Sequence, residues 1–235
     1  MGEGYSKAAL VKVWLGVGDE EAEHALRDIA QSYVDTRWRF FSPGEGKSRV
    51  QELCELIFSQ TYWTRIWVVQ EFVLAKELLL CYGSVQVAPH LFYQALIRLI
   101  LSSLKHNPAE FEAIRSLHAN QMFEHRSRGI AHNGYELAAL LTKYKNFEAT
   151  ELNDLVYVLL GLATDIETVG INVDYDSSFM EFLLEVSWYL HAKSPSNNSP
   201  DLSTLLDMIR NHRKRSDSEE VDESFMKLFT DKKEI

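Results

Sequence analysis

Three residues spaced four apart, Trp63, Trp67 and Glu71, form the pattern in this sequence that points most directly to chemistry. On a helix, residues at this spacing lie along one stripe. Burying a carboxylate on such an apolar stripe costs free energy unless it is paired, and no Lys or Arg stands three or four residues from Glu71. Two interpretations remain open. Glu71 is either a structural residue, hydrogen-bonded to backbone amides or to a distant arginine, or it lies in a cleft as a general acid or base or a ligand of ribose hydroxyls.

Other motifs carry weaker indications of chemistry. Gly16-Val17-Gly18 follows an apolar run, but Glu21 stands where a dinucleotide-binding loop needs its third glycine. Acidic residues there would also repel a pyrophosphate, so we expect a plain strand-to-helix turn. The eight histidines lack metal-ligand spacing, and no Gly-x-Ser-x-Gly elbow surrounds Ser84. We therefore predict neither a metal site nor serine hydrolase chemistry.

The apolar pattern predicts the elements that must position these residues. Short buried strands are expected over Ala8 to Leu15 and over Leu78 to Tyr82, which ends at Gly83. Helices are expected over residues 19–33, 47–58, 62–76, 89–100, 108–128, 136–144 and 154–163, and from a cap at Ser177 or Ser178 through Leu190. The segment 41–46 is expected to be a loop. The predicted fold class is mainly α with two to four short β-strands.

Composition narrows the classes of function. The 235 residues include 34 acidic and 24 basic side chains, for a net charge of −10, which disfavours nucleic acid and anionic membranes as partners. The most apolar stretch, Leu91 to Leu104, is too short and too interrupted for a membrane span. Two cysteines, Cys54 and Cys81, cannot form a disulfide framework or a four-thiolate zinc site. With no visible signal peptide, we expect a soluble, cytoplasmic protein.

Several segments together resemble fungal heterokaryon-incompatibility (HET) domains. Val13-Trp14-Leu15-Gly16 with its acidic turn is similar to one family segment, and the run from Trp63 to Glu71 (WTRIWVVQE) to another. The strand ending at Gly83, the run from Asp154 to Leu162 (DLVYVLLGL) and Asp174-Tyr175 extend the likeness. The residues that carry it are Trp14, Gly16, Trp63, Arg65, Trp67, Gln70, Glu71, Gly83, Asp154 and Tyr157.

The resemblance also has gaps. The family normally begins with a strand carrying Ser-Tyr-x-Trp-Gly and a second carrying Asp-x-x-Cys-Ile-Asn-Gln, and neither is present; Asn153 and Leu155 replace the usual Arg and Lys. The resemblance therefore implies a truncated protein: the C-terminal half of a HET domain over residues 1–88 and a helical continuation over 89–193. The turn residues and charge blocks after Lys193 indicate a polar linker with a mobile charged tail over 194–235. The first part would be an incomplete, TIR-like α/β layered domain.

The function implied by this resemblance is fungal non-self recognition, with associated programmed cell death. HET domains look distantly similar to TIR domains, some of which cleave NAD with a glutamate four residues after a tryptophan. Trp67 and Glu71 match that spacing, so Glu71 is the catalytic candidate and NAD a possible substrate; no cofactor is otherwise assigned. Because the strands that would bind the rest of NAD are missing, we expect this chain to be nearly inert. A third hypothesis is an interaction module that binds a protein partner or itself, because an incomplete sheet leaves an open edge.

Overall fold

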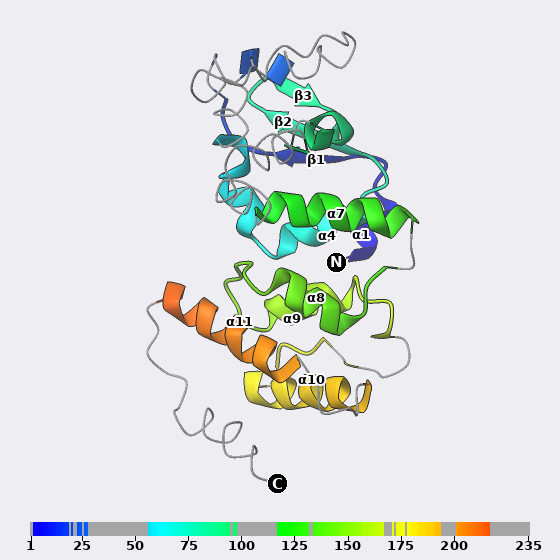
Figure 1. Cartoon of the computed structure of the whole chain (residues 1–235), viewed down its shortest axis with the longest axis vertical. Helices are drawn as coiled ribbons and strands as arrows, with labels where there is room; N and C mark the ends of the chain where they lie inside the picture. Colours follow the sequence, from blue (N-terminus) through cyan, green and yellow to red (C-terminus); the bar gives the residue numbers. More distant parts are fainter. Residues whose placement is uncertain are drawn as a thin grey trace.

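The computed structural model of this chain is mainly helical, with a three-stranded sheet at one end and α10 and α11 at the other (Figure 1). It describes residues 2–18, 20, 23–24, 26–27, 56–94, 96–97, 117–131, 134–166, 171, 173–176, 178–193 and 201–216. The predicted fold class, mainly α with a few short strands, is confirmed.

Several predicted segments lie outside the described residues. They are most of the helix expected over 19–33, the loop over 41–46, the helix from 47 as far as residue 55 with Cys54, residues 98–116, the linker over 194–200 and the tail from residue 217. Among the helices that the structure describes, none has the length and apolar content needed to cross a bilayer.

The sheet consists of β1 (Val11–Trp14), β2 (Leu78–Tyr82) and β3 (Val85–Val87), in the order β1-β2-β3. β1 is parallel to β2, with Val13 opposite Leu80, and β3 is antiparallel to β2, with Val87 opposite Leu80. These three side chains are buried and share one face, because side chains alternate along a strand. β3 was not predicted, since three residues are too few to show a periodicity.

β1 is shorter and more exposed than the buried strand predicted over Ala8 to Leu15. Val13 and Leu15 are buried, but Lys12 is exposed and Trp14 is 56% exposed. The prediction of a buried strand is correct for one face alone, because β1 is an edge strand of the described sheet and only its Val13 face belongs to the core. The apolar run from Ala8 to Leu15 therefore contains a strand that is buried on one face only.

Helices α1 (Gly2–Lys7), α4 (Trp67–Leu74) and α7 (His118–Ala131) lie beside one another next to the sheet (Figure 1). α4 packs against both α1 and α7 and also contacts β1. Aromatic rings pack between α4 and α7: the ring centroids of Phe72 and Phe123 lie 4.9 Å apart, and those of Phe72 and Trp63, which precedes α4, lie 5.7 Å apart. Both pairs meet edge to face, the favourable geometry for aromatic rings.

The second part of the chain consists of α8 (Leu137–Tyr144), α9 (Asp154–Leu160), α10 (Phe179–Lys193) and α11 (Asp201–Ser216). α8 packs against α9 and α11, and α10 also packs against α11. α9 in turn contacts α4 of the first part. The capping prediction for α10 is confirmed at Ser178, whose N–H donates to Glu181 Oε2 at 3.0 Å while the Glu181 N–H donates to Ser178 Oγ at 3.3 Å. This reciprocal pair is a capping box.

The structure differs from the sequence prediction at α11. Residues 201–216 were assigned to the polar linker and mobile tail, but they form a helix with Leu205, Met208 and Ile209 buried. The charged residues that follow the apolar face obscured its helical spacing in the sequence.

Candidate functional site

The predicted helix over residues 62–76 is two elements in the structure. A 3-10 helix, η1 (Thr61–Thr64), is separated from α4 by Arg65 and Ile66, and the extended backbone of Arg65 forms a β-bridge with Glu148. The Ile66 N–H donates to Glu148 O at 2.8 Å, and the Glu148 N–H donates to Thr64 O at 2.7 Å. This long-range pairing, invisible in the local pattern, interrupts the helix.

The interruption removes Trp63 from the stripe that the sequence predicted. Trp63 belongs to η1, is 1% exposed, and donates its indole N–H to the Ile57 carbonyl at 2.8 Å. Only Trp67 and Glu71 share α4, and both are half-buried. The expectation of three residues along one helical stripe was therefore wrong, and Trp63 is a core residue.

Glu71 faces two tyrosine side chains. The Tyr5 hydroxyl, from α1, donates to Glu71 Oε1 at 3.2 Å. The buried Tyr62 hydroxyl, from η1, faces the same carboxylate but does not reach hydrogen-bonding geometry with it. Burial first, and then the Glu71 charge, raise the pKa of both phenols, so both stay protonated at neutral pH.

The partner of Glu71 differs from both partners that the sequence suggested. Within the described part of the chain it is bonded to neither a backbone amide nor an arginine; a tyrosine 66 residues away takes that role. No local spacing could have indicated Tyr5 or Tyr62. A half-buried carboxylate beside protonated phenols can accept hydrogen bonds from a hydroxyl-bearing ligand, but Tyr5 already occupies Oε1.

A small apolar cavity lies away from this carboxylate. It is enclosed by α9, α10 and α11, with Leu155, Phe182, Val186 and Met208 among its lining residues. Its lining holds neither Glu71 nor either of the tyrosines that face it. The cavity therefore adds no binding volume to the carboxylate.

Two other motif residues of α4 join this helix to α9, and we call this contact the α4–α9 seam. The Trp67 indole N–H donates to Asp154 Oδ2 at 2.9 Å, and Gln70 Nε2 donates to the Val158 carbonyl at 2.7 Å. A Cβ at Gly161 would lie 2.6 Å from Gln70 Nε2. Gly161 thus leaves the space in which the Gln70 amide binds the end of α9.

Asp154 is the centre of the seam. It is 8% exposed, and Tyr175 donates to its Oδ1 at 2.8 Å while Trp67 donates to Oδ2. Burial and the hydrogen bond with Asp154 raise the pKa of Tyr175 to about 12. Asn153 and Leu155 flank Asp154 in the sequence, so neither neighbour supplies a positive charge. The structure shows that an indole and a phenol serve as its donors instead.

Tyr157 fixes the segment that carries Tyr175. Its hydroxyl donates to the Asp174 carbonyl and accepts the Asp174 N–H at 3.2 Å. The rings of Tyr157 and Tyr175 meet edge to face with centroids 5.0 Å apart. The motif residues of α4 and α9 thus form a continuous set of internal contacts.

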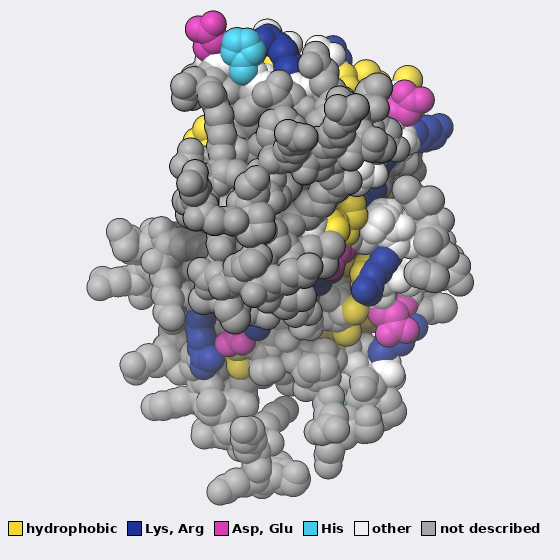
Figure 2. Space-filling model, turned by 45° about the horizontal axis from the view of Figure 1, so that its top comes forward, with side chains coloured by type: hydrophobic (Ala, Val, Ile, Leu, Met, Phe, Trp, Pro, Cys, Tyr) yellow, Lys and Arg dark blue, Asp and Glu magenta, His cyan; other side chains and the backbone are white. Residues whose placement is uncertain are grey.

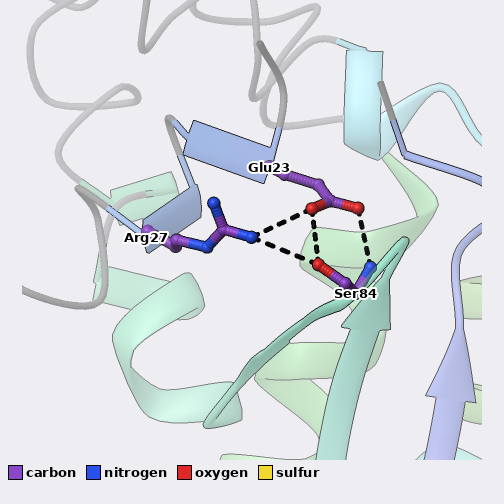
Figure 3. A network of polar contacts seen from close by, with 3 residues as sticks. All are labelled: Glu23, Arg27 and Ser84. Carbon is purple, nitrogen blue, oxygen red and sulfur yellow. Dashed lines mark hydrogen bonds and ion pairs between the residues drawn. The ribbon is translucent and has the colours of Figure 1, made fainter. Parts of the chain in front are cut away.

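The carboxyl ends of β1 and β2 carry a polar cluster that the sequence analysis missed (Figure 3). Glu23 accepts the Ser84 N–H at 2.7 Å and also the Ser84 hydroxyl, and Arg27 Nη2 donates to Glu23 Oε2 at 3.0 Å and to Ser84 Oγ at 3.2 Å. The hydrogen bonds from Ser84 lower the pKa of Glu23. The spacing of four between Glu23 and Arg27 was the available signal.

Gly83 is needed for this cluster to form. Its φ is +55°, and a Cβ there would lie 2.0 Å from Glu23 Oε1. Its N–H donates to the Gly16 carbonyl at 3.0 Å. Ligands of open α/β sheets bind outside the carboxyl ends of the strands, and here the paired side chains of Glu23 and Arg27 occupy that edge.

Trp14 differs from the other motif tryptophans because its side chain points away from the core. It is 56% exposed on β1, and Leu10 and Val17 near the two ends of this strand are 42% and 87% exposed. The view in Figure 2 shows acidic and basic side chains interspersed with hydrophobic ones on the described surface. Around β1, exposed apolar side chains thus lie beside the exposed Lys12.

Comparison with known proteins identifies the first part of the chain. Residues 1–71 match the family described as heterokaryon incompatibility protein (HET). No curated protein and no solved structure matches the chain. The matched segment contains Trp14, Gly16 and the residues from Trp63 to Glu71, whereas the likeness in α9 lies beyond it. Residues 1–71 therefore carry the sequence of a HET domain.

Proposed function

We propose that this protein acts in fungal non-self recognition and the associated cell death, and that it does so by binding protein rather than by catalysis. The observation that carries the proposal is the exposure of Trp14, a motif residue inside the HET segment, on an edge strand. Exposed tryptophans are favoured at protein interfaces because they bury a large area with few rotatable bonds. Trp67, in contrast, has its indole N–H bonded to Asp154 Oδ2 inside the fold.

The cellular test is induced expression in a filamentous fungus, with growth and uptake of a vital dye as readouts. We expect growth arrest and dye uptake for the wild-type chain and for Trp188→Ala. Trp188 is the matched control because it is 72% exposed on α10, outside the HET segment. Trp14→Ala should restore growth. Normal growth on induction of the wild-type protein, at confirmed expression, would refute the proposed function.

A second candidate function is NAD cleavage centred on Glu71, favoured by the half-buried carboxylate beside the Tyr5 and Tyr62 hydroxyls. Such a carboxylate is suited to bind ribose hydroxyls or to act as a general base. The test is nicotinamide release from NAD by the purified chain. Release that Glu71→Gln abolishes and Glu185→Gln, an exposed glutamate of α10, leaves intact would establish this activity. Equal rates for wild type and Glu71→Gln would exclude it.

A further inference from the structure

β1 has one edge that the sheet leaves open. The N–H groups of Val11 and Leu15 donate to the carbonyls of Glu77 and Cys81 at 2.9 and 2.8 Å. In a parallel ladder alternate residues face the neighbouring strand, so Val11, Val13 and Leu15 direct their N–H and C=O groups toward β2. The N–H and C=O groups of Lys12 and Trp14 therefore point to the opposite edge. No strand of the described residues pairs with them there.

The side chains of Lys12 and Trp14 share one face of β1, because they are two residues apart. Both are exposed. An exposed edge strand is a template for pairing with another strand. At this edge, Lys12 and Trp14 thus present backbone N–H and C=O groups that no described strand pairs with. Their side chains, an ammonium group and an indole, lie on one face of the strand.

We propose that the open edge of β1 binds a second copy of this chain, as an antiparallel strand pair with Val13 on the two-fold axis. This proposal rests on the proposed function, since it names the protein partner that Trp14 contacts. The pair would join the two sheets into one continuous sheet. Its symmetry is that of a closed dimer, in which the same patch serves on both copies.

The register follows from the backbone groups and the charges. With Val13 opposite Val13, each Lys12 stands opposite Trp14 of the second copy. Residues opposite each other in this way exchange both N–H···O=C bonds, so all the open-edge groups of Lys12 and Trp14 are used. Each Lys12 ammonium also lies beside an indole of the other copy, which is a favourable cation–π arrangement.

Each shifted register loses an interaction that the Val13 register keeps. Moving one strand by two residues in one direction would oppose Lys12 to Lys12, and like charges directly opposite destabilise a strand pair. It would also place Trp14 opposite Leu10, outside β1. A shift in the other direction would oppose Lys12 to Gly16, whose carbonyl already accepts the Gly83 N–H. The Val13 register is the one that avoids these losses.

The test is sedimentation equilibrium of the full chain over a wide concentration range. We expect a monomer–dimer equilibrium that Trp14→Ala and Lys12→Glu each weaken by about tenfold or more, since each dimer holds two Lys12–Trp14 contacts. Trp188→Ala should leave it unchanged. Circular dichroism checks that each variant is folded. A wild-type chain that is monomeric throughout, or Trp188→Ala and Trp14→Ala variants that weaken the dimer equally, would overturn the proposal.

Disulfide trapping tests the register independently of affinity. Mixed Lys12→Cys and Trp14→Cys proteins should form a disulfide between positions 12 and 14 under mild oxidation, identified by peptide mass spectrometry. Lys12→Cys alone should not cross-link efficiently at position 12, and efficient 12–12 cross-linking would refute the register. The outcomes also separate the two proposals. A monomer that still arrests fungal growth would overturn the dimer alone, whereas a dimer without effect on growth would overturn the function alone.

Discussion

The α4–α9 seam and the open edge of β1 both carry tryptophans of the HET resemblance, yet the two regions use them in opposite ways. In the seam, the Trp67 indole N–H is bonded to the buried carboxylate of Asp154. On β1, Trp14 is 56% exposed and lies beside Lys12 on the solvent face. The residues of the resemblance thus divide into those that hold helices together and those that lie exposed on the surface.

Residues of the α4–α9 seam should contribute to the stability of the fold, and residues of the open edge of β1 should contribute to binding. A residue whose polar groups are satisfied inside the fold contributes to the free energy of unfolding, and its loss leaves a partner unpaired. An exposed residue away from such contacts contributes little to stability, so a large effect of its removal must arise in binding. Substitutions in the two regions should therefore change different measurements.

The largest effect on stability is expected at Trp63, the motif tryptophan that is buried most completely. Trp63→Ala removes an indole that is 1% exposed and packs against Phe72, and should lower the free energy of unfolding by about 3–5 kcal/mol. Urea denaturation followed by circular dichroism measures the change. A loss below about 1 kcal/mol would contradict the assignment of Trp63 to the core.

Acid should destabilise the helical interior through His125, which lies in α7. This imidazole is 2% exposed, its Nδ1 lies 2.7 Å from the Tyr144 hydroxyl, and burial followed by the Lys143 charge lowers its pKa to about 4. The unfolded chain, with a pKa near 6.5, binds more protons between these values. Stability should therefore fall as the pH drops, by about 2 kcal/mol between pH 7.5 and pH 5.

The control for the acid effect is His125→Gln, compared with wild type by denaturation at both pH values. The difference in free energy of unfolding between pH 7.5 and pH 5 should be smaller for the variant by the contribution of His125. An equal pH dependence in the two proteins would show that His125 is not responsible.

An intermediate effect is expected from removing one donor in the seam. Trp67→Phe keeps an aromatic ring but leaves Asp154 Oδ2 without the indole N–H, at a cost of about 1–3 kcal/mol. Tyr175→Phe removes the other donor, and the double variant tests whether the two losses interact, as shared contact with Asp154 requires. Strictly additive losses in thermal denaturation would argue against a shared carboxylate.

The smallest effect on stability is expected at the open edge. Trp14→Ala should change the free energy of unfolding by no more than about 0.5 kcal/mol, because the side chain is largely in solvent. The measurement is made at a concentration where the chain is monomeric, so that loss of dimer does not contribute. Destabilisation similar to that of Trp63→Ala would place Trp14 in the core and remove the distinction between the regions.

The sequence predicted the elements whose signals are local. The strand over Leu78 to Tyr82 was predicted at its observed bounds, the helix over 136–144 is one residue longer than α8, and the cap at Ser178 lies where the capping box is found. In each case the residues that define the element are adjacent or one helical turn apart. Such patterns are readable without knowledge of the tertiary fold.

The features that the sequence could not indicate depend on contacts between distant segments. Arg65 breaks the predicted helix because it pairs with Glu148, and Glu71 is bonded to Tyr5, which lies 66 residues earlier. The exposure of Trp14 likewise depends on which face of β1 the core covers. The sequence identified Trp67 and Asp154 as motif residues, but only the fold shows that they are bonded to each other.

Residue-resolved hydrogen exchange of the β1 amides tests the central contrast most directly. We predict that the N–H groups of Lys12 and Trp14 exchange rapidly in dilute solution and more slowly as the concentration rises, while that of Val13 stays protected throughout. Amides of Lys12 and Trp14 that are as protected as Val13 in a dilute monomer would show that the edge is already paired. That result would contradict the account.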